Sequence, residues 1–400
     1  MITLPLVPEA PPALVRPVIT NPRPREVSFG TVAGRTGAGV TRIVVRVDGV
    51  TKADVALDSG RHRAFSAPSP FRIRVQLPPR DVTIRIITYN AAGQSTARSV
   101  GPVYGLPQAG FPVPIESIED PVLARRIKEL VRGYPGPAGV FVQDLRSGRG
   151  AAWNARARFQ AASTLKLGIA LELLRVLHGK PPPGTELANL FRRMLVYSDN
   201  EAANDLEIWL GGSTIGGAAR VNATLQTLGL SGTHMYGGYI IGTAAQRPIP
   251  LRVESQPPYF TFGKFTTAWD LARLHRLFHR AAVGTGSLMR LPGQFTPSDA
   301  RYVLYTLAHV RDPGKLDRYI GSEQGVSVLH KAGWITHARH DSGLVFWKQG
   351  AFVVTVMTWN WGEAGASSDV LAGRIARAAL RRYSAVAGRR PDPHEWLIQS

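Results

Sequence analysis

The chain of 400 residues is long enough for two or three domains with a sizeable core. Its composition, 44% hydrophobic and 19% charged, excludes a disordered chain, and the absence of any run of 18 apolar residues excludes a spanning helix. The lack of cysteine excludes disulfides, thiol nucleophiles and thiolate metal sites. The net charge of +20 comes from scattered arginines, which does not predict a nucleic-acid surface.

Residues 15–104 are predicted to form a small β-sandwich. The segments 41–50, 70–77 and 81–90 alternate apolar and polar residues with turn residues between them, as half-buried antiparallel strands do. The ending TYNAAGQSTARS resembles the last hairpin of bacterial immunoglobulin-like surface modules. No catalytic motif falls in this module, so we expect a spacer or an adhesion domain.

Three segments outside the domains are also predicted. Residues 1–14 are expected to be disordered, the Pro- and Gly-rich segment 105–116 is expected to be a linker, and 391–400 a C-terminal tail. The N-terminus has prolines and no basic region, which is not the pattern of a signal peptide. Either export is absent or the true start lies upstream.

Residues 117–390 are predicted to form an α+β domain. An early hairpin at 139–155 and late strands surround a run of helices, which favours one antiparallel sheet with terminal helices on one face and a helical lobe on the other. The expected helices are 119–132, 185–197, 200–210, 217–228, 266–282, 297–310 and 367–384, and the expected late strands are 326–332, 341–347 and 351–358.

A serine and a lysine begin an apolar helix at 159–178. Ser163 and Lys166 are three residues apart and therefore share a helix face, so the amine can point at the hydroxyl and activate it as a nucleophile. The chain has 40 arginines and only 8 lysines, yet position 166 is lysine. Only lysine can give up its proton near neutral pH, which favours chemistry at this position.

Two further motifs follow in the chain, LVYSDNEAANDL at 195–206 and LHKAGW at 329–334. S-x-x-K, S-D-N and a lysine-small-glycine triplet in this order resemble the class A β-lactamases among the penicillin-recognising serine hydrolases. FTTAWDLARLHRLF at 265–278 and HARHDSGLVFW at 337–347 are similar to flanking segments of that family. The resemblance covers roughly 117–385 and implies the β-lactamase/transpeptidase-like fold, with Ser163 in a cleft between the lobes.

The resemblance also implies a role for each motif residue in acyl transfer. Ser163 would attack a carbonyl and Lys166 would receive its proton, while Ser198 would pass a proton to the leaving nitrogen. Asn200 would bind the side-chain amide of the substrate, and Lys331 would attract its carboxylate. Gly333 would allow the backbone to approach closely, and the backbone N–H groups of Ser163 and Trp334 would form the oxyanion hole.

The sequence departs from the family pattern in ways that bear on turnover. Ala332 replaces a hydroxyl residue, the stretch between Lys166 and Ser198 is short, and the stretch after Asn200 is long. No E-P-x-x-N pattern, whose glutamate activates the deacylating water in class A enzymes, occurs in the Gly-, Tyr- and Pro-rich segment 231–263. Its only carboxylate, Glu254, is the candidate deacylation base, although a solvated loop glutamate fits its context better.

Histidine does not predict a metal site. His275 and His279 have the i, i+4 spacing of zinc ligands but no third ligand, and His337, His340 and Asp341 fall on a turn into a strand. We therefore expect no metal and no cofactor.

Three functions remain open from the sequence. The first is a β-lactamase-like serine hydrolase, the second a peptidoglycan D,D-peptidase-like or esterase-like enzyme, and the third a penicillin sensor or wall-associated protein that acylates without turnover. The expected ligand is a small β-lactam or a D-Ala-D-Ala-like peptide, and an anionic cell-wall polymer is a further expected partner. We expect no nucleic-acid partner, and we expect the protein to be a monomer. The resemblance implies an extracytoplasmic location.

Overall fold

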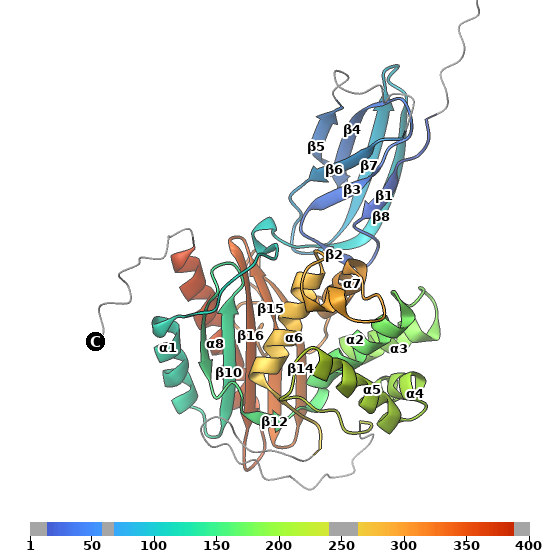
Figure 1. Ribbon diagram of the computed structural model, residues 1–400. Coiled ribbons are helices and arrows are strands. Elements are labelled where there is room, and N and C mark those ends of the chain that lie inside the picture. The colour runs from blue at the N-terminus through green and yellow to red at the C-terminus, as the bar shows by residue number, and fades with distance from the viewer. Residues whose placement is uncertain (1–13, 58–67, 240–262, 388–400) are drawn as a thin grey trace, which may run out of the picture. The chain divides into compact units, whose positions relative to one another are not determined.

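The computed structural model describes residues 14–57, 68–239 and 263–387. The chain divides into two compact units, Met1–Gly105 and Leu106–Ser400, which are coloured along the chain in Figure 1. The predictions for 1–13, for Glu254 and for the tail 391–400 lie outside the described residues.

The first unit contains two β-sheets. One has the order β1 (Val18–Asn21), β3 (Thr31–Arg35), β6 (Pro70–Arg74), and the other the order β2 (Glu26–Ser28), β8 (Ser95–Gly105), β7 (Asp81–Asn90), β4 (Val40–Val47), β5 (Val50–Ala56). In β4, Ile43 and Val45 are buried while Arg42 and Arg46 are exposed, which is the alternation expected of a strand with one face in a core. The predicted all-β unit is confirmed, and its finer assignment as immunoglobulin-like stays a prediction.

The second unit is built on one mixed sheet of six strands. Its order is β14 (Ser327–Ile335), β15 (Ala338–Trp347), β16 (Gly350–Trp359), β10 (Ala138–Asp144), β11 (Arg149–Trp153), β9 (Ile118–Glu119). All pairs are antiparallel except β11 with β9. The early hairpin β10–β11 thus pairs directly with the last strand β16, which brings both ends of the unit into one sheet as predicted.

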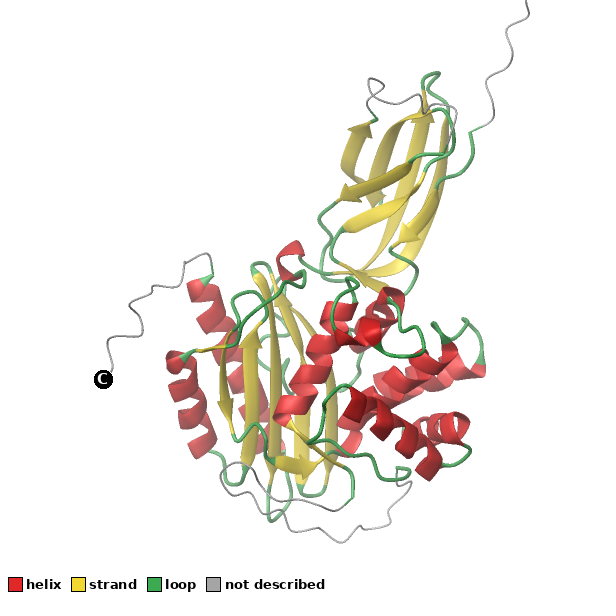
Figure 2. Ribbon diagram, in the orientation of Figure 1, coloured by secondary structure: helices red, strands yellow, loops and turns green. Residues whose placement is uncertain are grey.

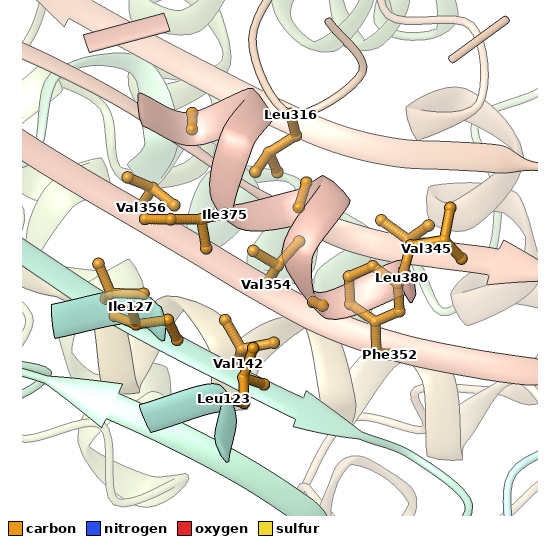
Figure 3. Packing of buried hydrophobic residues seen from close by; sticks show 14 of the residues in the cluster. Leu123, Ile127, Val142, Leu316, Val345, Phe352, Val354, Val356, Ile375 and Leu380 are labelled. Atoms are coloured by element: carbon orange, nitrogen blue, oxygen red, sulfur yellow. The ribbon is translucent and has the colours of Figure 1, made fainter. Parts of the chain in front are cut away.

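Helices cover both faces of this sheet (Figure 2). α1 (Pro121–Arg132) and α8 (Ala366–Val386) pack on one face, and α6 (Ala268–Ala281) lies on the other. The separate helical lobe contains α2 (Lys166–Leu177), α3 (Glu186–Val196), α4 (Asn200–Gly211) and α5 (Thr214–Thr227), and α7 (Pro297–Leu307) packs beside α3 and α6. The core between the sheet and α1 and α8 contains Ile127, Val354 and Ile375, all fully buried (Figure 3).

Most of the segment predicted as a linker belongs to the second unit, and it packs there at Gly110. This residue ends a short 3₁₀ turn, η2 (Gln108–Gly110), and its carbonyl oxygen lies 2.7 Å from Nε2 of the buried His279. A Cβ atom added at Gly110 would come within 2.6 Å of the ring of Phe346. The Gly- and Pro-rich composition of 105–116 therefore serves close packing at this point.

None of the helices in the described ranges has the length and apolar character needed to cross a membrane.

We predict that Ile375→Ala lowers the free energy of unfolding of the second unit by about 2–4 kcal/mol, because it leaves a cavity in the core. The neighbouring Arg374→Ala, at an exposed position on the same helix, is the matched control and should change it by about 0.5 kcal/mol or less. All eight tryptophans lie after residue 105, so tryptophan fluorescence during denaturant unfolding reports this unit alone. Equal effects of the two substitutions would contradict the packing described.

Candidate active site

The segment containing Ser163 lies at the start of a largely buried helix. Ser163 is in a 3₁₀ turn, η3 (Ala162–Leu165), that leads directly into α2 at Lys166. Every residue of α2 from Lys166 to Leu174 is buried, whereas Ser163 is only half-buried. The apolar sequence around Lys166 therefore carries its side chain into the protein interior while the serine stays accessible.

The amine of Lys166 has two hydrogen-bond acceptors. Its Nζ donates to the backbone oxygen of Ser198 at 2.5 Å and to Oδ1 of Asn200 at 2.7 Å. An uncharged amine has two N–H groups and one lone pair, so these two acceptors use both donors. In the described part of the chain the Ser163 hydroxyl makes no hydrogen bond. The Lys166 lone pair is thus available to accept a proton.

Burial lowers the pKa of Lys166 to about 6, with a further contribution from the positive charge of Lys331. The carboxylate of Asp199 acts in the opposite direction. Lys166 is consequently uncharged for the most part at pH 7, which is the form that a general base needs.

The S-D-N segment both caps α4 and contacts Lys166. Asp199 is the N-cap of α4, accepting from the backbone N–H of Ala202 at 3.0 Å, and it pairs with Arg193 at 2.6 Å. Ser198 has a φ of 58°, in the left-handed region. With Asp199 as the cap, the carbonyl of Ser198 and the side chain of Asn200 are both directed to Lys166.

The edge strand β14 supplies the second lysine. Lys331 is fully buried and its Nζ donates to Oγ of Ser198 at 2.8 Å and to the backbone oxygen of Ala332 at 2.7 Å. Burial lowers the pKa of Lys331 to about 8, although Asp312 and Asp341 favour its charged form. Lys331 therefore remains predominantly an ammonium group at pH 7.

The same strand contacts the nucleophile segment through Gly333. A Cβ atom at this position would lie 2.7 Å from the backbone nitrogen of Ser163 and 2.8 Å from that of Thr164. Only glycine allows this approach, because the atoms on the other side are backbone. Lys331 and Gly333 are two residues apart in a strand and so share the face of β14 that meets η3.

The histidines near β14 serve the interior of the protein. Nδ1 of His330 lies 2.8 Å from Asp341, and Oδ2 of Asp341 also accepts the backbone N–H of Leu316. Burial opposes a charge on His330, but Asp341 outweighs it and raises the pKa of His330. The described residues contain no group of three or more His, Asp or Glu side chains arranged to hold a metal ion.

The structure thus brings together most of the residues singled out in the sequence: Ser163, Lys166, Ser198, Asn200, Lys331 and Gly333. Trp334 follows Gly333 on β14 with its side chain 62% exposed. The roles assigned to these residues stay predictions at this point.

Three residues of the site were missed by sequence reasoning. The ring centroid of Tyr239 lies 4.6 Å from Nζ of Lys166 and 4.4 Å from Nζ of Lys264. Glu207 is a fully buried carboxyl group whose pKa is raised by burial to about 8, and its ionised form interacts with both lysines. A signal was present for Lys264, since it is another lysine in an arginine-rich chain. Glu207 continues the i, i+4, i+7 series of Asn200 and Asn204 on one face of α4.

Several solved structures have a fold similar to that of this chain. PBP-A is 21% identical, with a TM-score of 0.51, over 67% of this chain and 98% of its own. A mutant of PBP-A, described as an acyl-enzyme complex with penicillin G, is 20% identical with the same TM-score, over 68% of this chain and 100% of its own. A class A β-lactamase from Mycobacterium abscessus is 18% identical with a TM-score of 0.50, over 66% of this chain and 99% of its own. These similarities establish the β-lactamase/transpeptidase-like fold.

The sequence model of the β-lactamase enzyme family matches residues 122–181 and 174–383, which is more than half of the chain. The fold defines the class of the β-lactamase/transpeptidase-like proteins. The protein belongs to the β-lactamase enzyme family. A comparison with curated protein sequences found no match.

The left-handed backbone conformation of Ser198 is expected to affect stability. We expect Ser198→Gly to be more stable than Ser198→Ala by about 1 kcal/mol, because both remove the hydroxyl but only glycine adopts a positive φ without steric cost. Denaturant unfolding followed by tryptophan fluorescence measures the difference. An alanine variant as stable as the glycine variant would show that the left-handed conformation at 198 carries no strain.

Proposed function

We propose that the protein is a serine hydrolase that opens β-lactam amide bonds through an acyl-enzyme on Ser163. The observation that supports it best is the buried amine of Lys166, which donates to the Ser198 carbonyl and to Oδ1 of Asn200 one turn from Ser163, and whose pKa is lowered by burial to about 6. A nucleophilic serine needs such a base, and a solvated surface lysine would not serve as one.

In the proposed reaction Oγ of Ser163 attacks the amide carbonyl carbon and its proton moves to Nζ of Lys166. The tetrahedral intermediate collapses by breaking the C–N bond, and the leaving nitrogen takes the proton of Ser198 Oγ. The proton held by Lys166 then restores the Ser198 hydroxyl, so that protons balance. Lys331, already bonded to Ser198 Oγ, assists this transfer and attracts the substrate carboxylate.

The remaining binding roles follow the same proposal. Backbone N–H groups of Ser163 and Trp334 would hold the oxyanion, which the close contact at Gly333 supports by keeping β14 against η3. The side-chain amide of Asn200 would donate to the substrate, since its Oδ1 is taken by Lys166.

A second candidate is an acyl-enzyme that turns over slowly, as in a D,D-peptidase-like enzyme or a penicillin sensor. One observation favours it: within the described residues, neither Ser163 nor Lys166 hydrogen-bonds to a carboxylate that could activate a deacylating water. Asp199 is engaged by the α4 backbone and Arg193. The lack of an E-P-x-x-N pattern in the sequence 231–263 points the same way, and we propose rapid acylation followed by slow hydrolysis.

Both substrates, a β-lactam or a D-Ala-D-Ala-like peptide, are met outside the cytoplasm, so the proposal includes an extracytoplasmic location. The net charge of +20 supports contact with an anionic cell-wall polymer.

The first experiment is intact-protein mass spectrometry over time after mixing with penicillin G. We expect an adduct of the mass of the intact antibiotic that forms in the native chain, persists for minutes or longer, and is absent in Ser163→Ala. A rapidly lost adduct would identify an efficient β-lactamase and refute slow hydrolysis. No adduct in the native chain would refute acyl transfer from β-lactams to this serine.

The pH dependence of acylation follows from the two lysines. The second-order rate with penicillin G should rise with pH through about 6, where Lys166 loses its proton and becomes a base, and fall through about 8, where Lys331 loses its positive charge. Stopped incubations analysed by mass give the rate at each pH. In Lys331→Arg the upper limb should disappear, since arginine keeps its charge. A rate that is flat between pH 4.5 and 7 would contradict the role of Lys166.

A further inference from the structure

Behind the catalytic lysine, one aromatic ring lies against two lysine side chains. The ring centroid of Tyr239 is 4.6 Å from Nζ of Lys166 and 4.4 Å from Nζ of Lys264. An aromatic face attracts a cation without donating a proton to it. The ring of Tyr239 thus contacts both amines, and it attracts whichever of them is protonated.

The position of the ring is fixed through its backbone. The N–H of Tyr239 donates to Oδ1 of Asn204 at 2.5 Å, and Nδ2 of Asn204 donates to the carbonyl of Tyr239 at 2.8 Å. The preceding carbonyl, that of Gly238, accepts a hydrogen bond from Nζ of Lys264. Lys264 itself comes just before β13 (Phe265–Thr267), so its amine joins two segments that are far apart in the sequence.

A buried acid completes the cluster. Asn200, Asn204 and Glu207 lie on one face of α4, where the first contacts Lys166 and the second holds Tyr239. Glu207 is fully buried, and neither of its carboxylate oxygens has a hydrogen-bond partner among the described residues. Burial raises the pKa of Glu207 to about 8, so this carboxyl group is largely protonated at pH 7, and only its ionised form favours a charge on Lys264 and Lys166.

Arginines of the neighbouring helices α3 and α5 are paired with other groups. On α3, Arg193 pairs with Asp199. The one arginine of α5, Arg220, contacts Glu172 of α2, which also pairs with Arg175. The groups that set the charge of Lys166 are thus Lys331 from β14, Lys264 from the β13 end, Asp199 and Glu207 from α4, and the ring of Tyr239.

We propose that Lys264 is a positioning residue that keeps the Lys166 amine unprotonated. Its amine is held beside the Tyr239 ring by the Gly238 carbonyl, and in the ammonium form it repels a second positive charge at Lys166. Lys331 exerts the same repulsion but also contacts Ser198 and the expected substrate, whereas Lys264 contacts neither. The inference rests on the proposed function, because it explains how the base of that reaction is kept ready.

The test measures the protonation of Lys166 directly by NMR of the full chain carrying ¹³C-labelled lysine. The chain has only eight lysines, and the Lys166 signal is assigned by its loss in Lys166→Arg. Lys264→Met should raise the titration midpoint of Lys166 by roughly one pH unit, since it removes a nearby like charge. Lys264→Arg keeps the charge and should leave the midpoint as low as in the native chain or lower.

Two comparisons make the result specific. Lys348→Met, at an exposed lysine of the same unit, should not move the midpoint of Lys166. Glu207→Gln should lower the midpoint of Lys264, since it removes the group whose ionised form favours a charge on Lys264. An unmoved Lys264 signal would show that Glu207 does not influence Lys264. If Lys264→Met leaves the midpoint of Lys166 unchanged or lowers it, the proposal for Lys264 is wrong.

The same variants separate this inference from the proposed function. The NMR titration needs no substrate, so a shift of Lys166 in Lys264→Met without any penicillin adduct in the native chain would refute acyl transfer and leave the charge coupling intact. An unmoved midpoint in a chain that is acylated normally would refute the role of Lys264 alone. Where both hold, the lower limb of the acylation profile should move to higher pH by the same amount as the midpoint.

Discussion

The candidate site depends on the burial of one lysine amine. A charged Lys166 in the interior of the helical lobe would be costly, so the protein accommodates it uncharged, with both N–H groups bonded to oxygen atoms of the S-D-N segment. This constraint fixes several other features. Ser198 must present its carbonyl from a left-handed backbone, and Asp199 must cap α4 so that Asn200 can face inward.

The sheet contributes the second half of the site because of the two-residue period of a strand. On β14, Lys331 reaches Ser198 while Gly333 lies against the backbone of Ser163 and Thr164. β14 therefore supplies the positive charge of Lys331 and, through Gly333, its own close contact with the backbone at Ser163. Because β14 is an edge strand, one side of its backbone pairs with no other strand of this sheet among the described residues.

The sequence predicted those features that have a regular period or an ordered motif. The hairpin β10–β11, the helices α3, α4 and α6 and the three late strands all lie within a few residues of their expected ranges, because each buries one face with the matching period. The packing of 105–116 at Gly110 was not predicted, because its composition is also that of a linker. Tyr239 and Glu207 were missed since they carry no motif, and their importance arises from contacts between distant segments.

The chain contains far more arginine than lysine. With 40 arginines and 8 lysines, positive charge as such is supplied by arginine. Three of the eight lysines, Lys166, Lys264 and Lys331, nevertheless converge on one site, and all three have a pKa lowered by burial. An arginine at any of these positions would stay charged at every physiological pH. A charge that can change is required only of Lys166, the proposed base, whereas the roles proposed for Lys264 and Lys331 depend on their positive charge.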